Sequence, residues 1–315
     1  MKPIYILSLH NVRTGGPEAI HQLSDALLEQ GFDARMVYYD FDQIATIEQS
    51  PPQDGYRFGL RENTIEEYVR YKTNIVDAIP NDPDAIVVLP EVLCHLTPKF
   101  DRATVLVWWL SVDNGFGALS KVNLNYLRAP NVKHAYQSQY ARRFLDALGL
   151  DCVPLSDYTT DLSALAAPIP MAERPKLVLF NANRKVIADL DAIIAQIDEM
   201  DPCVECIKIT GTKSRQEMAD LFCYARVYVD LGNFPGKDRG PREAAAMGCV
   251  PLIASVGAGK TDLQNYAMHS DRDAVTIVRF VNDPEQPRAV LRGSVGSERS
   301  VFFNEVGATF GLLGA

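Results

Sequence analysis

The chain has 315 residues, with 31 Lys and Arg against 40 Asp and Glu, which gives a formal net charge of −9. Apolar residues make up 47% of the sequence, enough for a buried core and too many for a disordered protein. The acidic balance excludes sequence-independent binding to nucleic acid or to an anionic membrane, because both require an excess of Lys and Arg. The length accommodates one large α/β domain or two of ordinary size.

The sequence carries neither a membrane span nor a secretion signal that we can identify. No apolar run reaches the roughly 18–20 residues that a spanning helix needs, and the first ten residues turn polar too early for a signal peptide. The 6 cysteines are thinly spread, as reduced thiols usually are, unlike a disulfide framework. We therefore predict a cytoplasmic protein.

The first half of the chain alternates short β-branched runs with longer amphipathic ones. A strand is predicted over 3–9, followed by a helix that opens at Gly15-Gly16-Pro17 and ends at Gly31. Further strands are predicted over 33–38, 85–89, 104–109 and 134–136, with a helix over 140–148. Strands and helices joined by tight glycine turns predict a parallel sheet covered on both faces.

A segment with three prolines, 162–175, is predicted to be a linker, after which the alternation restarts. Strands are predicted over 176–180, 205–209, 227–230 and 250–254, and helices over 188–199, 214–223, 240–247 and 297–313. The fold class is therefore α/β, with two Rossmann-like domains, 1–165 and 166–296, that face each other across a cleft. Such folds bind ligands at the carboxyl ends of their parallel strands.

The most informative part of the sequence is the segment 233–253. It runs from a loop rich in glycine and proline into a short helix that carries Glu243, and then into an apolar strand. Backbone N–H groups at the start of a helix attract phosphate, and a carboxylate one step inside can accept hydrogen bonds from two ribose hydroxyls. The alternative interpretation is a plain connection whose glutamate caps its own helix.

This segment resembles the nucleotide-sugar-binding segment of the GT-B glycosyltransferases, especially of their large retaining family. The motif of that family has two glutamates separated by seven residues, then alanine and a small-residue turn before a Val-Pro strand. Glu243 falls on the second glutamate, which in that family holds the donor ribose, whereas Pro235 occupies the position of the first. The departure concerns the half of the motif that faces the sugar, where Asp238 is an alternative contact.

Two further segments match the same fold. Arg184 and Lys185 follow the first strand of the second domain, where similar enzymes clamp the donor diphosphate with an Arg and a Lys. Residues 10–16 follow the first strand of the chain, like the glycine-rich loop that lines the cleft in those enzymes. The plain alternatives are a solvated pair at a helix start and an ordinary turn. The resemblance also implies that the helix in 297–315 crosses back to the first domain.

The resemblance thus places the donor in the second domain and the acceptor in the first. Donor binding is assigned to Asn181, Arg184, Lys185, Gly211, Lys237, Asp238, Arg239 and Glu243. The acceptor or phosphate loop is assigned to Arg13, Gly15 and Gly16, with Trp109 as a surface for stacking on a sugar ring.

Catalytic candidates come from the turns that follow strands of the first domain. An inverting transferase needs a general base to deprotonate the acceptor hydroxyl, and Asp113, Glu91, His10 and His95 have suitable chemistry. A retaining enzyme, which the resemblance favours, can instead hold the acceptor hydroxyl against the leaving phosphate, with the Arg–Lys pair stabilising the developing charge. A purely structural role is the alternative for each of these residues.

Three other features are interpreted as structural. The segment 254–261 matches a phosphate-binding loop with alanine for its first glycine, but only 54 residues follow it, too few for the rest of a nucleotide hydrolase. Cys203 and Cys206 have the spacing of half a zinc site, with no suitable second pair. Arg239 and Arg242 flank Glu243 and add local positive charge, and the plain alternative for both is an ion pair with surface carboxylates.

The sequence therefore predicts a glycosyltransferase that moves a sugar from a nucleotide-sugar donor to a hydroxyl acceptor in polysaccharide or glycoconjugate synthesis. A retaining reaction without a metal or other cofactor is expected. The expected partners are the donor and a glycan or other hydroxyl acceptor, with no nucleic acid and no integral membrane segment, while peripheral membrane association is left open. Two alternatives stay open: a sugar-nucleotide epimerase or phosphorylase on the same fold, and a non-catalytic nucleotide-sugar-binding subunit.

Overall fold

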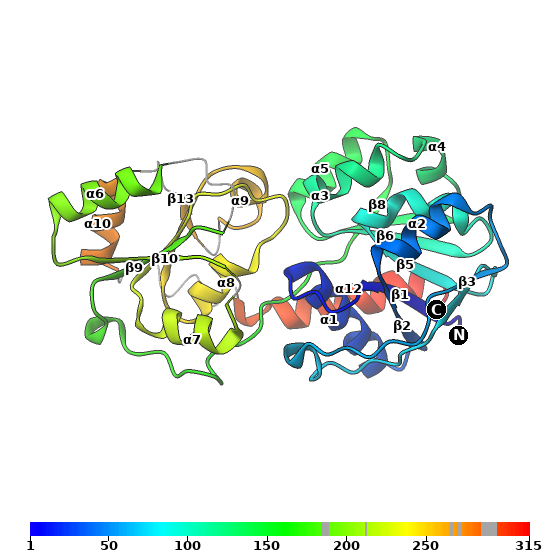
Figure 1. Ribbon diagram of the computed structural model, residues 1–315, viewed down its shortest axis with the longest axis horizontal. Coiled ribbons are helices and arrows are strands. Elements are labelled where there is room, and N and C mark those ends of the chain that lie inside the picture. The colour runs from blue at the N-terminus through cyan, green and yellow to red at the C-terminus, as the bar shows by residue number, and fades with distance from the viewer. Residues whose placement is uncertain (184–188, 212, 265–266, 270–272, 285–294) are drawn as a thin grey trace. The chain divides into compact units, whose positions relative to one another are not determined.

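The chain folds as two units, each built around one parallel sheet (Figure 1). The computed structural model describes residues 1–183, 189–211, 213–264, 267–269, 273–284 and 295–315. The first unit comprises Met1–Asp157 and Ser300–Ala315, and the second comprises Tyr158–Arg299. The chain first passes from one unit to the other after Asp157, before the predicted boundary at 165. Leu162 is already buried in the core of the second unit.

The first sheet has six parallel strands in the order β2-β1-β5-β6-β7-β8. Its strands are β1 (Ile4–Leu9), β2 (Ala34–Tyr39), β5 (Ile86–Pro90), β6 (Thr104–Trp109), β7 (Val132–Tyr136) and β8 (Cys152–Pro154). The predicted parallel sheet is therefore confirmed, and the three-residue β8 was not predicted. Parallel strands of this kind are apolar along their length because both faces of the sheet are covered.

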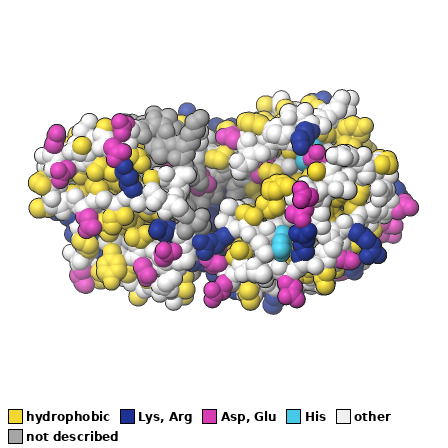
Figure 2. Space-filling view, in the orientation of Figure 1, with side chains coloured by type: hydrophobic (Ala, Val, Ile, Leu, Met, Phe, Trp, Pro, Cys, Tyr) yellow, Lys and Arg dark blue, Asp and Glu magenta, His cyan; other side chains and the backbone are white. Residues whose placement is uncertain are grey.

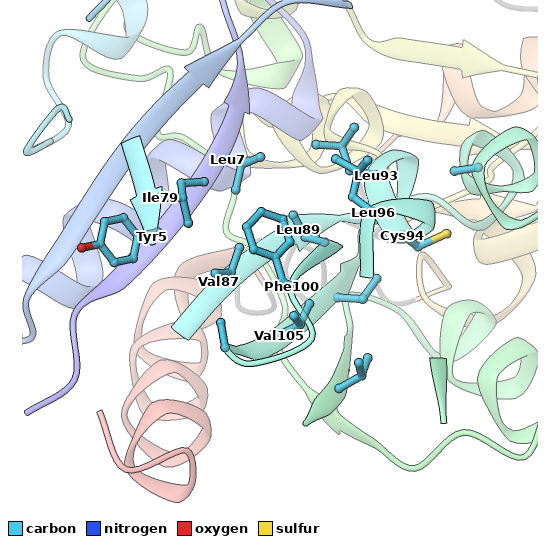
Figure 3. Close-up of a cluster of buried hydrophobic side chains, with 14 of the residues drawn as sticks. Tyr5, Leu7, Ile79, Val87, Leu89, Leu93, Cys94, Leu96, Phe100 and Val105 are labelled. Atoms are coloured by element: carbon cyan, nitrogen blue, oxygen red, sulfur yellow. The ribbon is translucent and has the colours of Figure 1, made fainter. Parts of the chain in front are cut away.

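Helical segments cover one face of this sheet. They are α2 (Phe41–Gln49), η2 (Glu91–Lys99), α3 (Val112–Leu119), α4 (Leu124–Leu127) and α5 (Gln139–Ala147). Alternate strand residues point into this core, where Val87, Leu89 and Val105 group with Phe100 (Figure 3). Of these segments only α5 was predicted: η2 and α3 contain Pro or Gly, α4 has four residues, and α2 was missed without such an interruption.

The opposite face is covered by α1 (Gly15–Glu29) and by α12 (Glu298–Leu312), drawn in blue and red in Figure 1. The predicted α1 is confirmed, including its end at Gly31, whose φ of 84° favours glycine. From Ser300 onward α12 belongs to the first unit, where the ring of Phe302 stacks on Trp108 with 6.5 Å between centroids. Nε2 of Gln30 donates to the carbonyl oxygen of Phe303 over 3.0 Å.

An irregular segment, 61–77, packs on α1 and buries polar side chains there. It contains η1 (Glu66–Tyr68) and lies between the strands of a small antiparallel hairpin, β3 (Gly55–Arg57) and β4 (Ala78–Pro80). The Tyr71 hydroxyl donates to Glu18 Oε1 over 2.8 Å, and the Lys72 N–H donates to Asp25 Oδ1 over 3.0 Å. These bonds satisfy polar side chains of α1 that the segment buries.

The second sheet has five parallel strands in the order β10-β9-β11-β12-β13. They are β9 (Leu177–Asn181), β10 (Glu205–Ile209), β11 (Val227–Asp230), β12 (Val250–Ile253) and β13 (Met268–His269). Val178 and Phe180 pack on one face, under α6 (Leu190–Met200) and α10 (Ala274–Asn282). Leu177 and Leu179 pack on the other, under α7 (Arg215–Tyr224) and α8 (Arg239–Ala246).

The segment predicted as a linker, 162–175, is a packed part of the second unit and contains η3 (Met171–Glu173). Arg174 is almost completely buried. Its guanidinium donates to the backbone carbonyl groups of Phe222 and Ala225 near the end of α7, and to that of Met247 at the end of α8. Because the last carbonyl groups of a helix lack partners within it, Arg174 caps two helices at once. The linker prediction is wrong for this reason.

The surface carries charges of both signs. On the visible face of each unit, Lys and Arg side chains are intermixed with Asp and Glu (Figure 2). Such a mixed face does not offer the continuous basic surface that a polyanion requires. Within the described ranges, no helix combines the length and the apolar character needed to cross a bilayer.

Phe302 tests the packing of α12 on the first sheet. We expect Phe302→Ala to destabilise the first unit by about 3–5 kcal/mol, because it leaves a cavity beside Trp108. Both tryptophans of the chain lie in this unit, so the fluorescence change on denaturant unfolding reports on it alone. The control is Val301→Ala, whose side chain is 47% exposed, and equal effects of the two variants would contradict the assignment.

Candidate functional site

The carboxyl edge of the second sheet carries a polar network at the point where the strand order reverses. β9 lies between β10 and β11, so the chain turns to opposite sides of β9, and open α/β sheets bind ligands at such a point. Asn181, the last residue of β9, donates from Nδ2 to Oδ2 of Asp230, the last residue of β11, over 2.7 Å. Asp230 is buried, and its Oδ1 accepts the N–H of Gly232 over 3.1 Å.

A cavity of about 440 Å³ opens beside this network. Gly211, in the turn after β10, has a φ of 67° that favours glycine. Its carbonyl oxygen accepts from Nδ2 of Asn183 over 2.8 Å. The described lining combines amides, a phenol and an ammonium group with apolar walls: Asn181, Asn183, Ile209, Gly211, Lys213, Met218 and Tyr228. Such a lining can hydrogen-bond a polar ligand and balance a negative charge.

The first turn of α8 lies next to Tyr228 and therefore next to the cavity. A Cβ atom at Gly240 would come within 2.7 Å of the Tyr228 hydroxyl, so only glycine fits without a shift. Arg215, at the start of α7, is also close. Burial lowers the pKa of Arg215 to about 10, while Glu243 raises it and Arg239 lowers it further. The charges of Arg239 and Glu243, in the first turns of α8, therefore act on Arg215 at the start of α7.

The predicted donor residues are only partly gathered here. Asn181, Gly211, Arg239 and Glu243 lie at this edge of the sheet. Arg184 and Lys185 lie outside the described residues, so the diphosphate clamp stays a prediction. Asp238 directly precedes α8, and its carbonyl oxygen accepts from Nε of Arg242 over 3.1 Å.

Lys237 differs from its predicted role, and Arg242 forms a buried ion pair in place of the surface pair given as its alternative. Arg242 is completely buried rather than at the surface, and its Nη1 lies 3.1 Å from both carboxylate oxygens of Glu298. Nζ of Lys237 lies 3.0 Å from Oε1 of the same carboxylate. Burial alone would raise the pKa of Glu298, but the two cations lower it to about 2. We therefore assign Lys237 to this ionic cluster instead of to the donor.

In the first unit, three predicted residues follow strands that are neighbours in the sheet. His10 follows β1, Glu91 follows β5 and Asp113 follows β6. Nε2 of His10 lies 3.0 Å from the carbonyl oxygen of Glu62. Asp113 is exposed in the first turn of α3 and accepts from the Tyr140 hydroxyl over 3.1 Å. The carboxyl edge of the first sheet thus presents an imidazole and an exposed carboxylate.

Glu91 is buried, in contrast to Asp113. Its Oε2 accepts the N–H of Leu110 over 3.1 Å, and a Cβ at Gly115 would lie 3.2 Å from its Cγ, so α3 closes over it. Burial raises the pKa of this carboxyl to about 7, although nearby backbone N–H groups, that of Ser111 included, oppose the shift. Glu91 thus holds the turn between β6 and α3 without reaching solvent, which corrects its assignment as a catalytic residue.

Other predictions for the first unit are corrected in part. Trp109 is completely buried and its Nε1 donates to Nδ1 of His134, so its ring is not available to a sugar. The prediction failed because the last residue of β6 points into the core. Gly15 and Gly16 open α1 as predicted, whereas Nη1 of Arg13 pairs with Oε1 of Glu67 over 2.7 Å. Nε2 of His95, the remaining acid–base candidate, lies against Oε1 of Glu48, while burial lowers the pKa of its imidazole.

The glycines that resemble a phosphate-binding loop serve close packing. The motif ends in α9 (Gly257–Thr261), and a Cβ at Gly257 would lie 2.2 Å from the carbonyl oxygen of Phe234. The N–H of Ala258 donates to the same oxygen over 2.8 Å. Cys203 and Cys206 are both free thiols. Within the part of the chain that is described, no three His, Cys, Asp or Glu side chains are grouped as metal ligands would be.

Several residues of this site were not found from the sequence: Asn183, Lys213, Arg215, Tyr228 and Asp230. A signal for Asp230 was present, because a carboxylate that ends an apolar strand lies at the edge where ligands bind. Arg215 carried a weaker signal, since a cation at a helix start opposes the helix dipole unless an anion is near. Tyr228 gave none, because an aromatic residue within a strand is ordinary.

Comparison with known proteins identifies the fold. No family model matches the chain, and no curated protein matches it by sequence. Sucrose-phosphate synthase from Thermosynechococcus elongatus superposes with a TM-score of 0.62 at 15% identity, covering 99% of this chain and 98% of that chain. HepE from Anabaena, solved with UDP and glucose, gives 0.56 at 10% identity, covering 99% and 100%.

A candidate UDP-N-acetylglucosamine 2-epimerase from Listeria monocytogenes is also similar, with a TM-score of 0.56 at 12% identity and a coverage of 98% and 97%. At such identities the likeness concerns the fold. The chain has the fold of the GT-B glycosyltransferases over nearly its whole length, which confirms the predicted fold class.

The buried Glu91 makes stability depend on pH. Because its folded pKa of about 7 lies above the ordinary 4.5, folding is favoured by the bound proton below pH 4.5, and this contribution is lost as the pH rises to 7. We expect Glu91→Gln, which cannot ionise, to gain about 3 kcal/mol relative to the unmodified chain between pH 4.5 and 8. Denaturant unfolding at several pH values measures this gain.

The control for this prediction is Asp113→Asn, which changes an exposed carboxylate in the neighbouring helix. Asp113→Asn should change the free energy of unfolding little at any pH in this range. A constant difference between Glu91→Gln and the unmodified chain across this range would show that Glu91 does not bind the extra proton.

Proposed function

We propose that the chain is a glycosyltransferase that moves a sugar from a nucleotide-sugar donor to a hydroxyl acceptor, in polysaccharide or glycoconjugate synthesis. The observation that carries the proposal is the cavity at the strand-order reversal of the second sheet, lined by Asn181, Gly211 and Tyr228, with the first turn of α8 packed against Tyr228. In the GT-B fold this lobe is the one to which the resemblance assigns the donor.

The chemistry of the site suits a nucleoside diphosphate. Glu243 supplies a carboxylate for ribose hydroxyl groups, and Arg215 and Arg239 place positive charge beside it. Lys213 adds an ammonium group at the wall of the cavity. Guanidinium groups bind phosphate oxygens strongly because they donate two parallel hydrogen bonds. The expected clamp by Arg184 and Lys185 would add charge for the leaving diphosphate.

We place the acceptor at the carboxyl edge of the first sheet. In a retaining reaction, which we favour, the acceptor hydroxyl is held against the leaving phosphate and needs no base from the protein. In an inverting reaction Asp113 is the base that we favour, since it is the exposed carboxylate among the candidates there. We expect a cytoplasmic enzyme that needs neither a metal nor another cofactor.

A sugar-nucleotide epimerase is the second candidate function. The Listeria monocytogenes protein solved as a candidate UDP-N-acetylglucosamine 2-epimerase is a similar structure, with coverage of both chains above 95%. An epimerase would convert the nucleotide sugar without an acceptor, whereas a transferase consumes it only when an acceptor is present. Incubation of each donor alone and with a panel of acceptors separates the two, and binding without any turnover would indicate a non-catalytic subunit.

Glu243 tests the donor site. We expect nucleotide sugars to raise the melting temperature of the unmodified chain, and Glu243→Ala to weaken donor binding about tenfold or more, because it removes hydrogen bonds to a charged group. Arg184→Ala tests the clamp in the same titration. The control is Glu199→Ala, an exposed carboxylate on α6. Unchanged affinity in both site variants would mean that the donor binds elsewhere.

A further inference from the structure

A buried ionic cluster lies within the second unit, directly before the candidate donor residues of α8. We call Lys237, Arg242, Glu298 and the N–H of Thr159 the Glu298 cluster. The carboxylate accepts from Arg242 over 3.1 Å, from Lys237 over 3.0 Å and from Thr159 over 2.7 Å. Arg242 is 0% and Glu298 5% exposed. The free-energy cost of removing both charges from water offsets the attraction between them. A well-packed apolar pair at these positions would therefore stabilise the fold equally well.

Arg242 also holds the loop that leads into α8. Its Nη2 donates to the carbonyl oxygen of Lys237 over 2.7 Å, and its Nε donates to that of Asp238 over 3.1 Å. These two residues directly precede Arg239, the first residue of α8. A planar guanidinium presents its donors in a rigid fork, so several acceptors bound to it are fixed relative to one another. The loop is therefore fastened to the helix that follows it.

The same contacts set which way α8 faces. Successive residues on a helix are rotated by about 100°, so the side chain of Arg242 and that of Glu243 point in different directions. Gly240 and Glu243 are three residues apart and share a face. Gly240 lies against Tyr228, which lines the cavity. Holding Arg242 on Glu298 therefore fixes the direction of Glu243, whose carboxylate lies near enough to Arg215 to raise the pKa of that guanidinium.

We propose that Arg242 and Glu298 are positioning residues for the donor site. They act through the loop 237–239 and the rotation of α8, so that Arg239 and Glu243 are in place before a donor binds; this inference rests on the proposed function. Thr159 and Glu298 lie within two residues of the two points where the chain passes between units. One carboxylate thus also fastens both connecting segments to the donor-binding unit.

The test removes the charges while keeping the volume of the core. In Arg242→Met/Glu298→Met neither partner is left as an unpaired buried charge, so the unit is expected to fold. Hydrogen exchange of the ligand-free full chain should become about tenfold faster or more in peptides covering 237–243, because these amides lose their fixed geometry. Peptides from β9 and α6 should keep their exchange rates. Unchanged exchange over 237–243 would overturn the proposal.

Arg174→Met is the matched control. Arg174 is also buried and binds backbone carbonyl groups, including that of Met247 at the other end of α8. The Arg174→Met variant is expected to lower the free energy of unfolding and to leave hydrogen exchange over 237–243 unaltered. If the double variant does not fold, Glu298→Gln, which keeps the size of the side chain, takes its place in the same measurement.

Binding of nucleoside diphosphates completes the test. By calorimetry, the one that binds the unmodified chain most tightly should bind the double variant about tenfold more weakly or worse, and Arg174→Met with unchanged affinity. Faster exchange with unaltered affinity would also overturn the positioning role. If the unmodified chain binds no nucleoside diphosphate, the proposed function fails, while the exchange experiment still decides whether the cluster orders the loop.

Discussion

Both sheets are parallel and covered on both faces, and this burial determines where polar chemistry can occur in the molecule. Interior strand positions such as Val178, Leu179 and Phe180 contact a core on one side or the other. A polar group at such a position would need a partner inside the protein. His134, inside β7, has such partners in Trp109 and Leu127. The polar groups of the candidate sites lie instead at strand ends, and all strands of a parallel sheet end at the same edge. Asn181 and Asp230 are the last residues of their strands, and Glu91 and His10 follow directly after theirs.

The strand-end groups fall into two classes that differ in exposure. Asp230 and Glu91 are buried and bind backbone N–H groups or a neighbouring amide, so they hold the turns in place. Asp113 and Asn183 are exposed and lie four and two residues after the ends of β6 and β9. Buried polar groups that are fully hydrogen-bonded make a site rigid. Each sheet thus has a fixed inner layer of polar groups that supports an outer layer able to meet a ligand.

The sequence predicted regular elements well where a pattern was long enough to show a period. The strands around Val105 and Val229 and the helix opened by Gly15 agree with the structure to within a residue or two. It did not predict the hairpin β3–β4 or β8, since three residues are too few for an alternation to show. α2 was missed although its start carries a capping box, Asp40 with Gln43.

A position at the edge of the second sheet was predictable where it depends on local chain geometry, as at Gly211, which lines the cavity there. Contacts distant in sequence were not predictable. Arg242 and Glu298 are 56 residues apart, and nothing in either neighbourhood indicates that they meet. For the same reason Lys237 was assigned to a ligand when its partner is this carboxylate. Trp109 was misassigned because a strand's last residue can face either the core or the edge, and only packing decides which.

The loop between β11 and α8 is held at both ends by contacts that do not involve a ligand. At its start, Phe234 is buried and its carbonyl oxygen accepts the N–H of Ala258. At its end, Arg242 holds the two residues before α8. Pro235, between these points, has a fixed φ. A loop restrained in this way loses little conformational entropy when a ligand binds. In a mobile loop that loss is larger and weakens binding.

The restrained loop contains Pro235 at the position of the first motif glutamate. In the motif that this segment resembles, the first glutamate belongs to the half that faces the sugar, and a proline at that position has no side-chain group that could form the same hydrogen bond. Under the proposed function, affinity for a donor then comes mainly from its nucleotide part, the part assigned to Arg239 and Glu243. Binding of the nucleotide, which does not react, lowers the barrier to sugar transfer only when it also orients the reacting sugar. A rigidly bound nucleotide is therefore the arrangement that best offsets weaker contacts to the sugar.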